Sequence, residues 1–177
     1  MTERKNEKQV TMEDVLSMRE ERVRLQQEML NAGKCPIISF SLNIPGPVKT
    51  SPKFQAVFEY GIEKIWETVR RNDWIVVCEL ECRRKAGYEF FMGVDAPEKE
   101  VKQAMTDIED KERTGRLFDI DVIGLNGQKI SRTEIGRSER KCMICDRPAY
   151  ECARSRKHSV EELLTYIEAL LHSERGV

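Results

Sequence analysis

The sequence has no long hydrophobic run and almost no net charge. Its 177 residues include 30 Lys and Arg and 31 Asp and Glu, which leaves a net charge of -1. This balance excludes a global electrostatic field that would draw the chain to nucleic acid or to an acidic membrane surface. No apolar stretch approaches the roughly 18 residues of a membrane-spanning helix, and the N-terminus lacks the apolar core of a secretory signal. We therefore expect a cytoplasmic protein.

Internal repeats and low-complexity tracts are also missing, so a single domain over residues 1–177 is expected, with a flexible polar segment at 1–10. A chain of this length can bury a sufficient core without disulfides. Six cysteines in a chain without an export signal indicate thiols or metal ligands rather than a disulfide framework.

Hydrophobic periodicity predicts an alternation of strands and helices after residue 35. The expected elements are a strand at 36–44, a helix from Pro52 to about Asn72, a hairpin of strands 74–82 and 88–94, a helix from about 97 to 113 and a strand at 115–122. This β-α-β-β-α-β order predicts an α+β fold, a ferredoxin-like plait.

Other elements are additions to that plait. Met12, Leu16, Val23 and Leu30 recur at near-heptad spacing and predict a helix from Thr11 to about Gly33. Asn126-Gly127 predicts a hairpin that returns through residues 128–132. A final helix is expected after Ser159, because Ser159 and Glu162 form a capping-box pattern before a leucine-rich stripe.

Two carboxylates stand two residues apart in the apolar stretch 115–122. Because residues i and i+2 share one face of a strand, Asp119 and Asp121 are predicted to point the same way. Neighbouring carboxylates repel each other and lose hydration when packed, so they need a cation or strong donors. Mg²⁺ is commonly held by one or two carboxylates and completed by phosphates. The pair predicts a metal-dependent phosphoryl or nucleotidyl transfer site; the alternative is a solvent-facing strand edge.

Three further charged features each have an interpretation that involves no ligand. Lys49 ends the stiff loop Pro45-Gly-Pro-Val-Lys49 and is either a phosphate contact or part of a plain connection. Arg19 and Arg22 fit a solvated helix face with Glu neighbours. Glu89, on the predicted hairpin, could aid a metal, although an outward-facing strand charge is the commoner explanation.

Residues 140–158, here called the Cys/His segment, carry the remaining chemistry. Cys142, Cys145, Cys152 and His158 offer four ligands within seventeen residues, the number that a closed tetrahedral zinc site takes. Reduced thiols with a substrate-contacting His158 are the alternative. A redox Cys-x-x-Cys is disfavoured, because the pair precedes an irregular segment rather than opening a helix. The surrounding basic residues suit an anionic substrate or an acidic protein partner.

Several of these motifs together resemble one family over residues 11 to 172. They are Arg19-Glu-Glu-Arg22, the loop that ends at Lys49, residues 115–122, the spacing from Cys142 to His158 and the last helix. The combination is similar to the apo-citrate lyase phosphoribosyl-dephospho-CoA transferases, also called citrate lyase holo-acyl-carrier-protein synthases. The resemblance implies transfer from 2'-(5''-triphosphoribosyl)-3'-dephospho-CoA to a serine of the citrate lyase acyl carrier (gamma) subunit, with release of diphosphate.

The resemblance also implies roles for residues. Mg²⁺ is expected on Asp119 and Asp121, with Arg116 and Lys49 on the phosphates and Gly115 in the binding site. The candidates for binding the substrate or the carrier are Arg19, Arg22 and Arg154. His158 could act as a base only if it holds no metal. Two alternatives are the analogous transferase for the malonate decarboxylase carrier and a non-enzymatic, zinc-stabilised interaction module.

Overall fold

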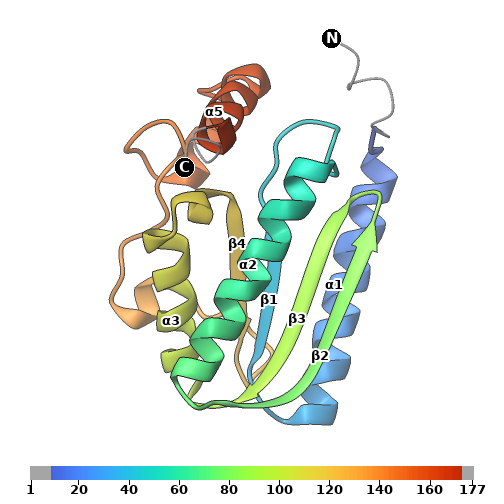
Figure 1. Cartoon of the computed structure of the whole chain (residues 1–177), viewed down its shortest axis with the longest axis vertical. Coiled ribbons are helices and arrows are strands. Elements are labelled where there is room, and N and C mark those ends of the chain that lie inside the picture. The colour runs from blue at the N-terminus through green and yellow to red at the C-terminus, as the bar shows by residue number, and fades with distance from the viewer. Residues whose placement is uncertain (1–8, 173–177) are drawn as a thin grey trace.

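The computed structural model describes residues 9–172, which form one antiparallel sheet with helices on both faces (Figure 1). The strand order is β2-β3-β1-β4. The strands are β1 Ile37–Leu42, β2 Ile75–Arg84, β3 Gly87–Asp95 and β4 Phe118–Ile123. The helices are α1 Met12–Gly33, α2 Pro52–Arg71, α3 Glu98–Lys111, α4 Ala149–Ser155 and α5 Val160–His172, with short 3₁₀ helices η2 Arg113–Leu117 and η3 Thr133–Ile135.

The predicted element order from residue 36 onward is confirmed, since β1, α2, β2, β3, α3 and β4 follow one another along the chain. The prediction of a flexible segment at residues 1–10 falls mostly on residues 1–8, which lie outside the described part. Among the described helices, none has both the length and the apolar character needed to cross a membrane.

Two predicted strand segments are wrong. Residues 115–117 belong to η2, because Gly115 packs against the end of α3, where its N–H donates to the carbonyl of Glu112 at 3.0 Å. After Asn126-Gly127 the chain returns only as far as an isolated bridge between Ile123 and Lys129. Beyond it, the backbone N–H of Ser131 donates to Glu134 at 2.6 Å, and this local bond accompanies the 3₁₀ helix η3 at Thr133–Ile135 in place of a strand.

The main core lies between the sheet and α2 and α3. Phe40 of β1 stacks on Phe58 of α2 with 5.1 Å between ring centroids, and Phe118 of β4 meets Phe40 edge-on at 5.3 Å. Gly61 is required at this contact, since a Cβ there would come within 2.3 Å of the Phe40 ring. Ile167 of α5 is also buried in this core. The alternation of β4 therefore directs Phe118, Ile120 and Val122 towards the helices α2 and α3.

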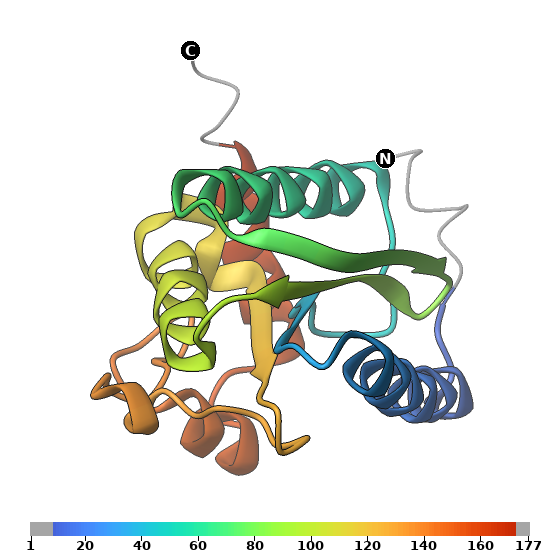
Figure 2. The same ribbon diagram turned by 90° about the horizontal axis from the view of Figure 1, so that it is seen from below.

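Helix α1 covers part of the opposite face of the sheet (Figure 2). The predicted apolar stripe of α1 is wrong for three of its four residues, because Met12, Leu16 and Val23 are 75%, 50% and 65% exposed, whereas Leu30 is buried. The side of α1 that meets the sheet instead carries Met18, Arg22, Gln26 and Leu30, spaced four residues apart. This side is half polar, so hydrophobic spacing could not reveal it.

The Cys/His segment is more regular than predicted. Helix α4, with seven residues, forms within it and was not expected from the sequence. The capping box of α5 is confirmed, since Ser159 and Glu162 exchange hydrogen bonds of 2.7 and 3.1 Å. Gly46, in the loop after β1, lies against Val160 of α5, so this loop and the end of the Cys/His segment are neighbours.

Candidate active site

Asp119 and Asp121 lie on the face of the sheet that α1 partly covers. Asp119 pairs across the strands with Ser41 of β1, and Asp121 pairs with Ser39. Directly paired residues share a face at short distance, so the two carboxylates stand beside two small hydroxyl side chains. The Asp119 and Asp121 side chains are 44% and 23% exposed, so solvent reaches both. The prediction that both carboxylates point the same way agrees with this register.

Each carboxylate is paired with a cation that the sequence motifs did not single out. Lys129 donates to Oδ2 of Asp121. Nη1 of Arg140 lies 3.7 Å from Oδ1 of Asp119 and 3.5 Å from Oε1 of the buried Glu109. In the sequence, Arg140 is one of several basic residues around the cysteines. Its connection to β4 is a long-range contact that no local spacing indicates.

A third carboxylate lies in the same row of the sheet. Glu89 of β3 is opposite Ser41, is only 1% exposed, and accepts from Nε of Arg22 at 2.5 Å. Arg84 is a second partner at 3.4 Å. The expectations of an outward-facing Glu89 and of a solvated Arg22 are therefore wrong. A buried carboxylate requires a paired cation, and α1 supplies it.

Lys49 lies near Arg19, which belongs to the first half of α1. Burial, followed by the nearby positive charge of Arg19, lowers the pKa of Lys49. The ammonium group of Lys49 donates to the backbone carbonyl of Ile44, and so it closes its own loop. Two neighbouring cations, one of them exposed, form a region of positive potential that an anion would stabilise.

Arg116 and Gly115 flank the start of β4. The Arg116 guanidinium turns to the carbonyl of Lys141 at 3.5 Å, towards the Cys/His segment. Gly115 is buried, and a Cβ on it would lie 2.4 Å from the carbonyl oxygen of Glu109. Close backbone packing is thus a sufficient reason for glycine at this position.

Side chains of α3, together with Arg140, form hydrogen bonds along the outer edge of β4. Oε1 of Glu109 accepts from the backbone N–H of Ile120 at 2.9 Å, and Nζ of the buried Lys102 donates to the carbonyl of the same residue at 3.3 Å. Arg140 donates to the carbonyls of Arg116 and Phe118 at 2.7 and 2.6 Å. These bonds replace a neighbouring strand, so β4 is held rigidly where it carries the two aspartates.

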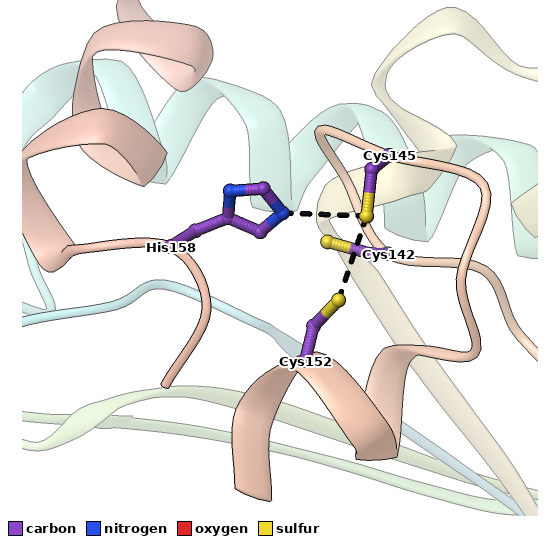
Figure 3. Close-up of side chains that lie close together, drawn as sticks. All are labelled: Cys142, Cys145, Cys152 and His158. Carbon is purple, nitrogen blue, oxygen red and sulfur yellow. Dashed lines mark hydrogen bonds between the residues drawn. The ribbon is translucent and has the colours of Figure 1, made fainter. Parts of the chain in front are cut away.

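The four predicted zinc ligands converge (Figure 3). One ligand atom from each of Cys142, Cys145, Cys152 and His158 lies within 4.8 Å of the other three. The sulfurs of Cys145 and Cys152 are 3.5 Å apart, and Nε2 of His158 is 3.3 Å from the Cys145 sulfur. Cys142 and Cys145 come from one turn, Cys152 from α4 and His158 from the loop before α5.

The electrostatic setting of these thiols differs. A hydrogen bond with His158, and a second from the backbone of Arg147, lower the pKa of Cys145 to about 6. Burial raises the pKa of Cys152 to about 11. A thiolate already favoured at Cys145 is the species that a soft metal ligand requires.

The cluster fits a zinc ion. Zn–S bonds of about 2.3 Å in a tetrahedron place two sulfurs about 3.8 Å apart, which is close to the observed Cys145–Cys152 separation. Three thiols and one imidazole are a usual set for a closed structural site. No other group of three or more potential ligands is found among residues 9–172, so the Asp119 and Asp121 pair would need substrate oxygens to complete a coordination shell.

Among residues 9–172, no hydrogen bond or ion pair joins Arg154 to the aspartates. Arg154 lies exposed on α4, two residues after Cys152, and the exposed Arg156 and Lys157 follow the end of that helix. The predicted site residues therefore occupy two neighbouring regions. Asp119, Asp121, Arg19, Arg22 and Lys49 belong to the sheet face and its loops, whereas Arg154 belongs to the Cys/His segment.

Two solvent-accessible carboxylates on a rigid strand, each paired with a cation, are compatible with an enzyme that acts on an anionic substrate. Comparison with known proteins identifies this enzyme as a transferase. The sequence model of the family described as "Apo-citrate lyase phosphoribosyl-dephospho-CoA transferase" matches residues 10–174, and the chain belongs to this family. The protein attaches phosphoribosyl-dephospho-CoA to the citrate lyase acyl carrier protein.

Relatives in three genera support this membership. A Citrobacter koseri protein with the family's description is 32% identical over 163 residues, covering 92% of this chain and 89% of its own. The same description preceded by "Probable" belongs to a Vibrio cholerae serotype O1 protein and a Streptococcus pyogenes serotype M3 protein. The Vibrio protein is 41% identical over 92% of both chains, and the Streptococcus protein is 40% identical over 93% of this chain and 86% of its own.

The predicted family and activity are thus confirmed. Membership favours the citrate lyase carrier over the malonate decarboxylase carrier, and an enzyme over a binding module without chemistry.

Proposed function

We propose that this single-domain transferase uses 2'-(5''-triphosphoribosyl)-3'-dephospho-CoA as donor and a serine of the citrate lyase gamma subunit as acceptor. The observation that supports this most is the pair of solvent-accessible carboxylates on one face of β4, surrounded by cations. The serine oxygen forms a bond to the α-phosphorus, and the bond from that phosphorus to the oxygen bridging to the β-phosphate breaks. Diphosphate leaves with the bridging oxygen, and the hydroxyl proton passes to water.

We assign the fold to the ferredoxin-like plait, in which β1 and β4 are sheet neighbours. The assignment explains why residues 41 and 119, far apart in sequence, are opposite each other. It also brings the loop after β1, which carries Lys49, to the same end of the sheet as the start of β4, where the N–H of Asn43 donates to the Leu117 carbonyl at 2.8 Å.

Asp119 and Asp121 fit a hard divalent cation. Both present oxygen ligands and both are reached by solvent. The third carboxylate of the row, Glu89, is engaged by Arg22 and Arg84, so phosphate oxygens would complete the coordination shell. Mg²⁺ bound here would neutralise charge that develops on the phosphate oxygens in the transition state. In the structure, Lys129 and Arg140 balance the negative charge of these two carboxylates.

The remaining roles follow from position. Arg19 and Lys49 offer positive charge at one end of the carboxylate face, and Arg22 holds Glu89 in the same row. Arg116 is assigned to the phosphates, because it lies in η2 two residues before β4 and its guanidinium makes a long contact of 3.5 Å with the Lys141 carbonyl. Gly115 lets this turn approach α3 closely. Arg154 is assigned to recognition of the carrier.

Zinc in the Cys/His cluster is proposed as structural. A bound zinc ion would cross-link the turn at 142–145, helix α4 and the loop before α5. These parts have little regular secondary structure to hold them together otherwise. A His158 held by metal cannot accept a proton, so no general base is assigned. The attacking hydroxyl would then be activated by position and by the field of neighbouring cations.

The test is a reconstitution with purified components. The protein is incubated with the apo-carrier and the triphosphoribosyl donor, and the carrier mass and released diphosphate are measured. One phosphoribosyl-dephospho-CoA per carrier, with one equivalent of diphosphate, supports the proposal. Transfer of the group with triphosphate or monophosphate released instead would contradict it.

A further inference from the structure

The two cations nearest to the aspartates are Lys129 and Arg140, and neither belongs to a motif that carried the functional assignment. The cations that sequence reasoning placed on the phosphates are engaged elsewhere: Lys49 bonds the Ile44 carbonyl and Arg116 the Lys141 carbonyl. The positive charge in contact with the carboxylates therefore comes from residues after β4.

The position of Lys129 follows from strand register. The chain turns at Asn126-Gly127, and residue 129 forms an antiparallel bridge with Ile123. The backbone bonds Gly124 N–H to Gln128 carbonyl and Ile130 N–H to Val122 carbonyl, both 2.9 Å, fix this register. Bridge partners share a face, and Ile123 shares its face with Asp121 two residues before it. Lys129 is thus directed at Asp121 by the backbone, while its side chain stays 59% exposed.

Arg140 is fixed from the other side. Its guanidinium donates to two carbonyls of the η2–β4 connection and lies 3.5 Å from Glu109, so it is oriented independently of Asp119. It is also two residues before the first cysteine of the metal cluster. A planar guanidinium in a fixed position beside an accessible carboxylate is suited to bidentate contact with phosphate oxygens.

We infer that Lys129 and Arg140 are phosphate-binding residues for the donor, held on Asp121 and Asp119 until a divalent ion replaces them there. This rests on the proposed function, since it takes the triphosphate donor and the metal-binding carboxylates as given. Without ligands, two carboxylates and two cations balance one another. A divalent ion that takes over the carboxylates repels both cations, and the phosphates that accompany the ion attract them. Lys129, on an exposed side chain, moves further than Arg140, which stays anchored to the backbone.

Replacement of Lys129 by a metal ion on Asp121 predicts opposite changes in two affinities, which a purely structural role of Lys129 would not produce. Lys129 competes with a metal ion for Asp121, but it attracts phosphate. Removing it should therefore strengthen metal binding in the absence of phosphate and weaken triphosphate binding in the presence of metal. A variant with a damaged fold would lose both affinities.

The experiment uses Lys129→Met in the full-length protein. Mn²⁺ affinity without phosphate is measured by electron paramagnetic resonance, and the affinity for inorganic triphosphate at saturating Mg²⁺ by calorimetry. We expect Mn²⁺ to bind several-fold more tightly and triphosphate about tenfold or more weakly, as for loss of one charge-assisted contact. The matched control is Lys111→Met, because Lys111 is also exposed and pairs with Asp107 at 2.8 Å on α3, and it should change neither affinity.

Arg140→Lys provides the second arm, since it keeps the charge but loses the fork geometry. It should weaken triphosphate binding by a similar factor per folded molecule, whereas Arg83→Met, a control at an exposed ion pair of β2, should leave triphosphate affinity unchanged. Unchanged triphosphate affinity in both Lys129→Met and Arg140→Lys overturns the inference, as does weaker Mn²⁺ binding in Lys129→Met.

Failure of the metal assignment is visible separately. If Asp121→Asn binds Mn²⁺ as tightly as the wild type, the aspartates do not hold the metal and the exchange mechanism falls with them. Loss of triphosphate affinity in Lys129→Met would then still establish its contact with phosphate, because calorimetry with triphosphate does not depend on transfer to the carrier.

Discussion

The carboxylate strand β4 and the Cys/His segment lie next to each other, yet they are built in opposite ways. Strand β4 is regular, is paired with β1, and has its outer edge completed by Glu109, Lys102 and Arg140. The Cys/His segment contains the seven-residue helix α4 and adds Met143 to the edge of the main core. Burial of the apolar face of β4 positions its aspartates without a metal, whereas the segment has four converging ligands that a metal would join.

The difference separates two uses of a metal ion. At β4 the ion is expected to act in chemistry and to leave the fold intact when absent, because cations already balance the carboxylates. In the Cys/His segment the ion is expected to contribute to folding, because binding free energy becomes folding free energy where local structure is weak.

The largest effect is expected at the aspartates. Asp119→Asn and Asp121→Asn should each lower the transfer rate at least about a hundredfold, since each removes charge from a metal that stabilises the transition state. The unfolding midpoint should stay close to that of the wild type. Asp146→Asn is the control, because Asp146 is 97% exposed and meets only Lys141 at 3.4 Å. Near-normal turnover by a folded Asp119→Asn or Asp121→Asn protein at saturating donor would remove that residue from the site.

The next effect concerns the segment's metal. Cys145→Ser, or treatment with a chelator, should increase hydrogen exchange over residues 140–158 strongly, while β1 and β4 keep their protection. Transfer should fall less than in the aspartate variants. Cys82→Ser, a cysteine of β2 outside the cluster, should leave exchange in the segment unchanged. Stoichiometric zinc is expected by elemental analysis, and a fully active protein that lacks zinc and gains no stability from it would contradict this role.

A smaller effect is expected at the junction of the two regions. Gly115→Ala places a Cβ 2.4 Å from the Glu109 carbonyl, so the backbone must shift and unfolding should become easier by about 1–3 kcal/mol. Urea denaturation measures this change. Donor affinity per folded molecule should change less than for Arg116→Met. A larger loss of donor affinity in Gly115→Ala than in Arg116→Met would make Gly115 a substrate contact rather than a packing residue.

The smallest effect is expected at the start of α5. Ser159→Ala removes the side chain that accepts from the N–H of Glu162 at 3.1 Å and should cost about 1 kcal/mol of stability. Transfer should be unaffected. Ser138→Ala, at an exposed loop position before the segment, is the comparison and should cost less. An equal loss in both variants would show that the capping box contributes little to anchoring the segment.

The sequence predicted the regular parts of the fold because their hydrophobic periods agree with their final packing. Phe118, Ile120 and Val122 alternate with the aspartates, and this pattern alone indicates both the strand and the shared face. The four metal ligands were also recognisable, since their spacing is short and their chemistry is specific.

The errors arose where long-range contacts decide the local structure. Residues 115–117 were predicted as part of a strand, but close packing on the end of α3 places them in the 3₁₀ helix η2. The α1 stripe was assigned to exposed residues, because its true face uses Arg22 and Gln26 to reach Glu89 and Ser39. Lys129 and Arg140 were missed as site residues for the same reason. One signal was available for Lys129: the Asn126-Gly127 turn fixes which residue lies opposite Ile123.

The central claim is that Asp119 and Asp121 support metal-dependent transfer of phosphoribosyl-dephospho-CoA to the carrier. It is tested most directly by mass spectrometry of the apo-carrier after incubation with donor and either wild-type protein or the Asp121→Asn variant, across a Mg²⁺ titration. The account predicts that wild-type transfer rises with Mg²⁺ and stops without a free divalent ion, and that the variant stays at least about a hundredfold slower at every concentration. Wild-type transfer that persists unchanged without free Mg²⁺ while Asp121→Asn keeps pace with it would contradict the account.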